Sequence, residues 1–532
     1  MHRGVRFGSL CGRPAAWLLL GILAAVAQPG LAADADTVRV LVRFAGHLPG
    51  AGERPLIAGE MRVRHEFPEV GALALEVPRQ RLEELRRSPG VVAVEEDPVR
   101  YALGSLGGAE LQPSRTNGLY GLVSTRAILV QKRGIVGQGA TVCVADTGID
   151  AGHPDIAPAF RGGVDEVDHD DDPDIGPHPG PSAIHGTHVA GTAIAALNGV
   201  GVRGVAYGAG LYVARVLGND GQGQASDVMD GVRHLVEVRG CKVVSLSLGG
   251  TRSSSIEAAF YAEMIQRGAL IVAAAGNEGK AGMDFPAGYP GVLAVGAVDS
   301  LNRHASFSNV GVGLGVSAPG VGVLSAVPRE EGVESSVKMV KTTYAALGME
   351  FAGNTDGITQ PLVDCGSGNS LGEFPPTVSG KIALIRRGDQ TFAVKAQNAM
   401  DAGAVAAIIY NNQVGDFSGT LNSARTTDGR DWIPVVGVSD KIGAALRRSK
   451  GRPATLVNAL TAWATESGTS MATPHVAGIA ALLLGVNPAL SAADLTSILE
   501  QTAIRLGGRG YNTTYGWGLV NADAAVRAAQ RR

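Results

Sequence analysis

Three short motifs carry side chains suited to nucleophilic catalysis. Ser470 lies in the run Gly468-Thr-Ser-Met-Ala-Thr-Pro-His-Val-Ala-Gly478, directly before an apolar segment that predicts a helix over 471–484. A hydroxyl at a helix start faces unsatisfied backbone N–H groups and the positive end of the helix dipole, which suits an oxygen that becomes anionic. An ordinary N-cap serine is the commoner explanation of an isolated Thr-Ser pair. The catalytic interpretation therefore depends on the other two motifs.

Those motifs supply a carboxylate and an imidazole. Asp146 ends the apolar run 142–145, which predicts a buried strand, and His185 opens the small-residue helix that begins His-Gly-Thr-His-Val-Ala-Gly. A serine hydroxyl is a weak nucleophile without a neighbouring base. We expect Ser470 to attack a carbonyl, His185 to take and return the proton, and Asp146 to orient the imidazole.

The three motifs, in the order Asp, His, Ser, resemble the signatures of the subtilase family of serine peptidases. The resemblance implies an α/β fold and peptide-bond hydrolysis through an acyl-enzyme on Ser470. It also implies a role for Asn277, which stands on the glycine-flanked turn Ala273-Ala-Ala-Gly-Asn-Glu-Gly279. Its amide and the backbone N–H of Ser470 would hold the oxyanion. A turn-forming asparagine is the alternative.

The elements that must position these residues alternate along the chain. Apolar runs at 142–145, 211–216, 243–248, 270–275 and 292–298 predict strands, and 185–197, 226–238 and 255–267 predict helices. This alternation predicts a parallel sheet with helices on both faces. Ligands bind beyond the carboxyl ends of such strands, where Asp146 and Asn277 fall. We expect this catalytic domain at 118–340 and 461–532.

The N-terminal third predicts export and processing. Residues 1–33 combine Arg3 and Arg6, the apolar stretch 15–26 and a small-residue cut site, and so predict a signal peptide; an uncleaved anchor is the alternative. We expect a secreted or periplasmic protein with no membrane contact after signal cleavage. Residues 37–101 resemble the ferredoxin-like subtilisin propeptide, with strands at 38–44, 73–77 and 91–95 and a helix at 79–87.

The propeptide resemblance implies an intramolecular inhibitor and chaperone whose tail lies along the catalytic cleft. An unrelated binding module is the alternative. The Gly-, Ser- and Pro-rich residues 102–117 predict a linker that contains the maturation cut, although the sequence does not fix the bond.

Within an insertion expected at 341–460, a second resemblance covers most of residues 364–438 and is strongest between 380 and 412. It is to the protease-associated (PA) domain, a β-rich module, which here would be inserted between Asn277 and Ser470. Its role is open between two alternatives: the module gates or recruits substrate, or it is a passive insertion.

Substrate contacts are also implied by the subtilase resemblance. Gly221 and Gly223 match an edge strand that pairs with an extended peptide, and such an edge makes loose demands on sequence. Asp284 matches the base of the primary specificity pocket, where an inward carboxylate would favour Arg or Lys at the cleaved position. The stretches that flank this pocket match Ser247, Leu248, Gly249, Ala274 and Gly276.

A structural calcium ion is a further expectation from the resemblance. Calcium takes carboxylate, amide and carbonyl oxygens. The side chains of Asp155 and Asn198 and the carbonyls of Ala196, Val200 and Val202 match the ligands of a subtilisin calcium loop. A surface loop without metal is the alternative.

Three cysteines follow the signal peptide. Cys143 and Cys241 lie at two predicted strands, which would permit a bridge in an exported protein if those strands are neighbours. Two buried thiols are the alternative, and Cys365 is left over in either case.

Composition fits a large enzyme. The chain has 532 residues, enough for several domains, 75 glycines, and a formal net charge of −3. This charge gives no indication of a nucleic-acid or acidic-membrane partner. We predict a serine endopeptidase made as a zymogen that acts on proteins and peptides. A non-cutting peptide binder and a repetitive adhesive protein are the alternatives; the complete catalytic set argues against the first, and the lack of tandem repeats against the second.

Overall fold

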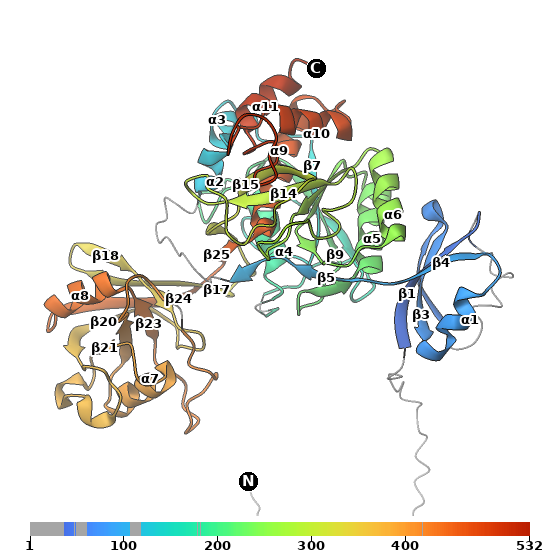
Figure 1. Ribbon diagram of the computed structural model, residues 1–532. Helices are drawn as coiled ribbons and strands as arrows, with labels where there is room; N and C mark the ends of the chain where they lie inside the picture. The colour runs from blue at the N-terminus through green and yellow to red at the C-terminus, as the bar shows by residue number, and fades with distance from the viewer. Residues whose placement is uncertain are drawn as a thin grey trace, which may run out of the picture.

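The computed structural model describes residues 37–46, 48, 61–106, 119–177, 179–180, 182–417 and 419–532. The predicted signal peptide lies outside these residues, as does most of the predicted linker. Figure 1 shows a small N-terminal sheet on one side of a central α/β body and a β-rich module on the other.

The central body is built on a seven-stranded sheet in the order β15-β14-β13-β11-β7-β9-β8, and all its neighbouring strands are parallel. Its strands are nearly all buried, as expected of a sheet covered on both faces. The predicted fold class is confirmed. The strands are β7 (Thr141–Asp146), β8 (Phe160–Asp165), β9 (Gly210–Arg215), β11 (Val243–Leu246), β13 (Leu270–Ala274), β14 (Leu293–Val298) and β15 (Leu314–Pro319).

Two apolar clusters fill the two faces of this sheet. One contains residues of α4 (His185–Ile194), α9 (Thr469–Val486), α10 (Ala492–Gln501) and α11 (Ala522–Ala529). The other contains residues of α5 (Ala225–Arg233) and α6 (Ser255–Gln266). Helix α5 continues as a π-helical turn, His234–Val238, which the sequence prediction had merged with it. Smaller helices, α2 (Tyr120–Ser124) and α3 (Ala127–Gln131), pack at the start of the body.

Helix α9 is the apolar centre of the body. Within the described chain it alone is long and apolar enough to span a membrane, but 89% of its most apolar window is buried inside the protein. A core helix passes the same test of length and composition. Its burial fixes the N-terminal turn that carries Ser470.

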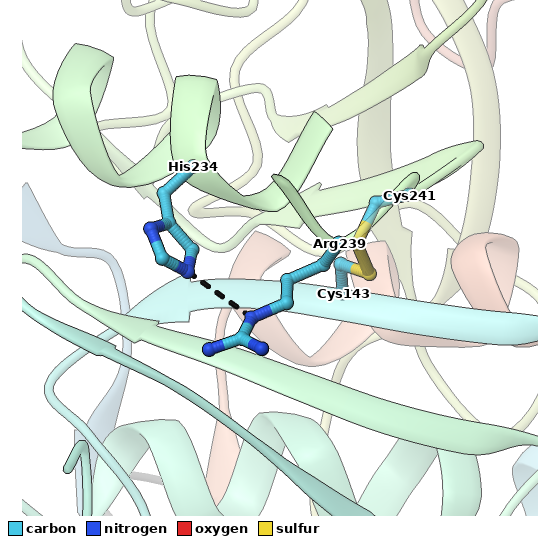
Figure 2. Close-up of a disulfide and its surroundings, with 4 residues drawn as sticks. All are labelled: Cys143, His234, Arg239 and Cys241. Atoms are coloured by element: carbon cyan, nitrogen blue, oxygen red, sulfur yellow. Dashed lines mark hydrogen bonds between the residues drawn. A yellow bond between two sulfur atoms is a disulfide. The ribbon is translucent and has the colours of Figure 1, made fainter. Parts of the chain in front are cut away.

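A disulfide joins two neighbouring central strands. Cys143 lies in β7, and Cys241 precedes β11, which pairs with β7. The two sulfur atoms are bonded, with the Cα atoms 6.2 Å apart (Figure 2). Arg239 Nε donates to His234 Nε2 beside the bridge. The bridged alternative is therefore confirmed, and Cys365 is free and buried.

The N-terminal sheet is antiparallel, with the ferredoxin-like order β2-β3-β1-β4. Its strands and its α-helix are β1 (Thr37–Phe44), β2 (Arg62–Phe67), β3 (Ala72–Pro78), β4 (Val91–Glu96) and α1 (Leu82–Arg86). The predicted helix at 79–87 is shorter because residues 79–81 form a 3₁₀ turn. The sequence prediction missed β2, whose polar run Arg-Val-Arg-His-Glu-Phe lacks a clear apolar alternation.

The inserted module contains an eight-stranded mixed sheet in the order β18-β17-β24-β20-β21-β22-β23-β19. Helices α7 (Phe392–Asp401) and α8 (Asp440–Arg448) pack on it. Two antiparallel strands, β17 (Gly332–Met339) and β24 (Pro453–Thr461), connect it to the body. The other strands are β18 (Thr342–Ala345), β19 (Leu347–Gly348), β20 (Thr355–Asp364), β21 (Ile382–Arg386), β22 (Ala406–Tyr410) and β23 (Val435–Val438).

Candidate active site

The predicted acid and base lie in contact. Asp146 ends β7 and His185 begins α4, and His185 Nδ1 lies 2.7 Å from Asp146 Oδ1. Both side chains are buried. Burial alone would lower the pKa of His185, but the charge and hydrogen bond of Asp146 raise that pKa above its usual value. The pair is therefore arranged to stabilise an imidazolium.

Ser470 occupies the first turn of α9, within the same cleft. Its Oγ donates to the carbonyl of Ser247 at 2.8 Å, and Ser247 Oγ donates to the carbonyl of Ser470 at 2.8 Å. His185 Nε2 is buried and accepts no hydrogen bond from any described group. The structure thus joins Asp146 to His185, while the Ser470 hydroxyl turns to Ser247 instead of to the imidazole.

Asn277 holds a carbonyl from the chain itself. Its Nδ2 donates to the backbone oxygen of Leu103 at 2.5 Å. Its Oδ1 accepts from the backbone N–H and the hydroxyl of Thr469, both at 2.9 Å. Thr469 therefore fixes which end of the amide faces Leu103. Sequence reasoning missed this role of Thr469, although the residue adjoins Ser470 in the motif.

The segment before Leu103 lies in the cleft as an extended strand. Strand β5 (Val99–Ala102) pairs antiparallel with β10 (Gln222–Gln224) on one side and β12 (Leu248–Gly249) on the other. The Ala102 N–H donates to the Gly221 carbonyl at 2.9 Å, and the Leu103 N–H donates to the Ser247 carbonyl at 3.2 Å. Gly223 pairs with Arg100, and Leu248 with Ala102. The edges predicted to bind substrate therefore hold residues 99–103.

The segment after Leu103 continues along a different strand. Strand β6 (Ser105–Leu106) pairs antiparallel with β25 (Trp463–Ser467), the strand that leads into α9. Gly104 lies between β5 and β6 and against His185: a Cβ added there would come within 2.6 Å of His185 Cδ2. Only glycine fits this approach without displacing the imidazole. The Leu103–Gly104 peptide thus lies between Asn277, Ser470 and His185.

In the predicted specificity pocket, the Asp284 carboxylate is already paired with the ammonium group of Lys280. The Leu103 side chain packs against Gly249, because a Cβ on Gly249 would lie 2.9 Å from Leu103 Cδ1 and 3.1 Å from Asp284 Cβ. Asp284 is buried, and Lys280 Nζ lies 3.0 Å from its Oδ1. Burial raises the pKa of Asp284 although Lys280 opposes the shift.

Two more predicted pocket residues lie in the same region. Gly276 backs on the Asp284 carboxyl: a Cβ added at Gly276 would come within 2.9 Å of Asp284 Cγ. Ala274 ends β13 and is buried.

The predicted calcium loop is closed by hydrogen bonds to Asp155. The carboxylate accepts from Asn198 Nδ2 at 2.8 Å, from the Val202 N–H at 3.0 Å and from Trp463 Nε1 at 2.7 Å. Asn198 Oδ1 accepts from the Val200 N–H. The Ala196 carbonyl accepts from the Asn198 N–H. The five residues therefore do meet, but the Asp155 oxygens already hold N–H donors.

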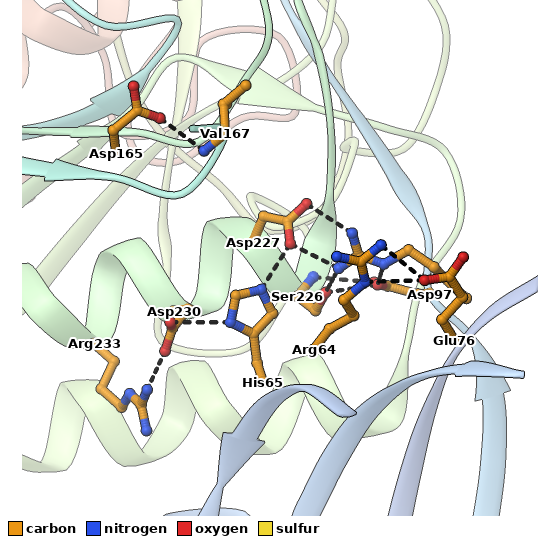
Figure 3. A network of polar contacts seen from close by, with 11 residues as sticks. Arg64, His65, Glu76, Asp97, Asp165, Val167, Ser226, Asp227, Asp230 and Arg233 are labelled. Carbon is orange, nitrogen blue, oxygen red and sulfur yellow. Dashed lines mark hydrogen bonds and ion pairs between the residues drawn. The ribbon is translucent and has the colours of Figure 1, made fainter. Parts of the chain in front are cut away.

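A polar network fixes the N-terminal sheet on the body (Figure 3). His65 lies between two carboxylates of α5, with Nε2 2.8 Å from Asp227 and Nδ1 3.0 Å from Asp230. Asp97 accepts from the backbone N–H and the hydroxyl of Ser226 at the start of α5. Glu95 accepts from the Ser255 N–H at the start of α6. Carboxylates of the N-terminal segment thus cap two helices of the body.

Comparisons with known proteins identify the family of the chain. The Subtilase family profile matches residues 137–396, which contain Asp146, His185 and Asn277 and end before Ser470. The PA domain profile matches residues 358–446. Subtilisin NAT of Bacillus subtilis subsp. natto is 37% identical over 271 residues, which span 50% of this chain and 66% of subtilisin NAT, just under two thirds of that relative.

Other relatives extend the match. The thermostable alkaline protease of Halalkalibacterium halodurans is 36% identical over 287 residues, which cover 54% of this chain and 73% of that protease. The subtilisin-like protease Apa1 of Pseudoalteromonas sp. AS-11 superposes with a TM-score of 0.56 at 29% identity, over 77% of this chain and 98% of Apa1. Fervidolysin of Fervidobacterium pennivorans shares the fold at 22% identity, with a TM-score of 0.58 over 93% of this chain and 62% of fervidolysin. On this evidence the chain belongs to the subtilase family and carries a PA domain.

Proposed function

We propose that the protein is a secreted serine endopeptidase, made as a zymogen that first cuts its own Leu103–Gly104 bond. One observation carries the proposal. The Leu103 carbonyl accepts from Asn277, while the Leu103 N–H shares the Ser247 carbonyl with the Ser470 hydroxyl. A peptide bond of the chain is thereby held beside a nucleophile and an oxyanion donor, with the general base next to the leaving nitrogen.

The chemistry follows from these contacts. Ser470 Oγ turns from Ser247 toward His185 Nε2, gives up its proton there and bonds to the Leu103 carbonyl carbon. Asn277 Nδ2 and the backbone N–H of Ser470 stabilise the oxyanion, a contribution of about 10²–10³ in rate for one such donor. His185 then protonates the nitrogen of Gly104 as the C–N bond breaks. Water releases the acyl group by the reverse proton path.

Substrate selection follows from the same strands. Backbone pairing on both sides of β5 binds any extended peptide, so most positions tolerate many side chains. Leu103 occupies the primary pocket, where Lys280 neutralises Asp284. We therefore infer a preference for an apolar residue before the scissile bond, in place of the Arg or Lys preference expected from Asp284 alone.

The N-terminal segment would act as the inhibitor of the same site, because its tail fills the cleft that a substrate must enter. Secretion is supported by the apolar N-terminal sequence and by the Cys143–Cys241 disulfide, a bond typical of oxidising compartments. The domain limits given above remain predictions.

Calcium at the Asp155 loop also remains a prediction. The oxygens present are of the kind that calcium takes. To coordinate an ion, Asn198 would have to present its oxygen, and Asp155 would have to release the donors that it now holds. The ion would then add to a loop already closed by hydrogen bonds, and a chelator should lower the melting temperature of the wild type more than that of Asn198→Ala.

Fluorophosphonate labelling combined with mass spectrometry tests the main proposal. An enzyme labels at Ser470, and its mature form begins at Gly104. A folded wild-type protein that neither labels nor cleaves an exposed polypeptide would be a peptide binder. Labelling with a mature N-terminus elsewhere would retain the peptidase and reject the Leu103–Gly104 assignment.

A further inference from the structure

Glu466 carries a buried carboxylate that has no partner. It lies in β25, between β6 and β16 (Val323–Ala326) in a three-stranded sheet, so its backbone is held on both sides. The residue is 2% exposed, and its Oε1 atom is buried without a hydrogen bond. Within the part of the chain that the structure describes, no cation pairs with this carboxylate. A buried charge without a partner is costly, so a cationic ligand gains free energy by binding there.

The carboxylate faces the residue that follows the proposed cut. A Cβ added at Gly104 would lie 3.0 Å from Glu466 Oε2 and 2.9 Å from His185 Nε2. Glu466, His185 and Gly104 also line one cavity of about 280 Å³, together with residues of β5. The unpaired carboxylate therefore lies on the leaving-group side of the Leu103–Gly104 bond, next to the imidazole that protonates the leaving nitrogen.

Two imidazoles near Glu466 do not supply the missing charge. Burial lowers the pKa of His188, although Glu466 opposes the shift, so this imidazole is neutral at pH 7. Burial also lowers the pKa of His185, but the charges of Asp146 and Glu466 raise it above its usual value. His185 must nevertheless be without its proton before it can accept the one from Ser470. The cation is therefore missing in the state that begins the reaction.

The reaction itself produces a cation at this position. The Gly104 nitrogen carries one hydrogen in the intact peptide bond. It takes a second from His185 as the C–N bond breaks. It takes a third from solvent, because an α-amino group with a pKa of about 7.7–8.0 is mostly protonated at pH 7. Cleavage therefore converts an uncharged amide beside Glu466 into an ammonium ion.

We propose that Glu466 binds the ammonium group that cleavage creates, so that the downstream half of the cleft is a binding site for peptides with a free amino terminus. The proposal rests on the proposed peptidase function. An uncut substrate carries an amide at this position and gains nothing from the charge of the carboxylate, so the site is selective for the product. The preferred terminus is glycine, because a Cβ at that position would come within 2.6 Å of His185 Cδ2.

Inhibition of the processed enzyme by two peptides tests the proposal. One is Gly-Ser-Leu-Gly-Gly, the sequence of residues 104–108, with a free amino group, and the other is its acetylated form. The substrate is a chromogenic anilide of residues 99–103 at pH 7. We expect competitive inhibition, with an inhibition constant about tenfold lower for the free peptide, because only this peptide forms the charged hydrogen bond. The amino terminus of the mature chain competes with both peptides alike, so the ratio is unaffected.

Glu466→Gln should reduce the ratio of the two inhibition constants to about one, because the amide keeps the size of the side chain and loses its charge. Asp220→Asn is the matched control. Asp220 lines the same cavity, but it is exposed and its Oδ1 already accepts from the Gln222 N–H. This variant should retain the tenfold ratio.

A second measurement uses the Ser470→Ala protein, whose Leu103–Gly104 bond stays intact. Adding Glu466→Gln to it should not lower the melting temperature, because the change removes a buried charge that lacks a partner. A lower melting temperature would show that the carboxylate already has a partner in the uncut chain, and would overturn the proposal.

Equal inhibition by the two peptides would also overturn it. A ratio that survives in Glu466→Gln, together with a shifted pH profile of kcat/KM, would assign the carboxylate to His185 instead. Failure of the wild type to cleave the anilide would refute the peptidase function itself, so the two failures are distinguishable.

Discussion

The N-terminal segment and the inserted module contact the catalytic body in different ways. The N-terminal segment docks without covalent bonds to α5 and α6. An apolar surface that includes Phe67 packs against Phe260. Charged groups surround it: His65 lies between Asp227 and Asp230, and the carboxylates of Glu95 and Asp97 lie at the starts of α6 and α5. The module is instead continuous with the body, because β25 and its partner β16 (Val323–Ala326) lead into β24 and β17. The N-terminal segment is joined covalently to the body only at its carboxyl end, where the proposed cut lies, whereas the module is covalently joined at both ends.

The N-terminal segment is the addition whose tail occupies the cleft. Strand β5 occupies the upstream half of the cleft and β6 the downstream half. If the proposed cut is made, the N-terminal segment would be held by its interface alone, and that interface would then decide when the cleft becomes free. The module would remain attached to the body, because both of its ends are continuous with body strands. Variants of the active site and of the interface can distinguish the removable N-terminal segment from the permanently attached module.

The largest effect is expected from Ser470→Ala. This change removes the nucleophile, and turnover should fall by about 10⁶, as for other serine peptidases of this type. The N-terminal segment should then become as permanent as the module, because the Leu103–Gly104 bond stays intact. Gel electrophoresis and intact-mass measurement of the purified variant check this. Normal maturation of the variant expressed alone would exclude cleavage in cis.

The next effect concerns Arg100 and Glu257, an ion pair between β5 and α6 whose side chains are both fully buried. Arg100→Ala leaves the Glu257 carboxylate buried without its cation, which typically costs about 3–5 kcal/mol. We expect the cleaved N-terminal segment to leave at least about 100-fold faster. The lag before full activity after self-cleavage measures this rate.

Arg252→Ala is the matched control. Arg252 pairs with Glu96 across the same interface, but both side chains are more than 60% exposed. Exposed pairs contribute little because water screens them, so the lag should hardly change. An equal change of the lag in both variants would show that the interface depends on the number of its ion pairs and not on whether they are buried.

Docking of the N-terminal segment, unlike the attachment of the module, should depend on pH. His65 is buried, which lowers its pKa, but the hydrogen bonds and charges of Asp227 and Asp230 raise that pKa from 6.5 to about 9. In the released segment the imidazole has its ordinary pKa, so docking is strongest when the solution pH is below 6.5. The contribution of His65 is lost as the pH rises through about 9.

Glu166 acts in the same direction. Burial, together with the nearby charge of Asp230, raises the pKa of Glu166 to about 8, so it gains a charge next to Asp230 in the same range. We expect the lag to shorten by about tenfold or more between pH 6.5 and 9.5. His65→Asn should flatten this dependence, and an unchanged slope in that variant would contradict the role of His65.

The sequence predicted which residues form the catalytic site better than it predicted which segments contact that site. Asp146, His185, Asn277 and Ser470 stand in motifs, so their types and local structure are visible in short windows. The proposed Leu103–Gly104 cut could not be predicted from the sequence, because it depends on the register of β5 between β10 and β12, strands more than 100 residues away. A similar reason hid β2, which is polar on its own and becomes ordered only against β3 and α5.

The same limit applies to side-chain partners. Asp284 matched the base of the pocket, but its partner Lys280 lies on the exposed side of the same turn, where sequence gives no orientation. The predicted strands of the central sheet were found within one or two residues because each is a buried apolar run. Among the interactions that depend on tertiary placement, the family resemblance supplied the catalytic contacts, and the positions of Cys143 and Cys241 on two predicted strands supplied the disulfide.

The smallest effect concerns the pocket that receives Leu103, the last residue of the N-terminal segment before the proposed cut. Lys280→Met removes the cation that faces Asp284 while keeping a side chain of similar length. Asp284 is 1% exposed and Lys280 37% exposed, so the pair is only partly screened. Without Lys280, an arginine of the substrate is the nearest available partner for the carboxylate. We expect the ratio of arginyl to leucyl peptide cleavage to rise about three- to tenfold, measured as kcat/KM at pH 8.

Asp284→Asn in the same background should return the ratio to its original value, because the amide carries no charge to be paired. A ratio that stays constant in Lys280→Met would mean that Asp284 faces away from the bound side chain, and that Gly249 alone sets the depth of the pocket.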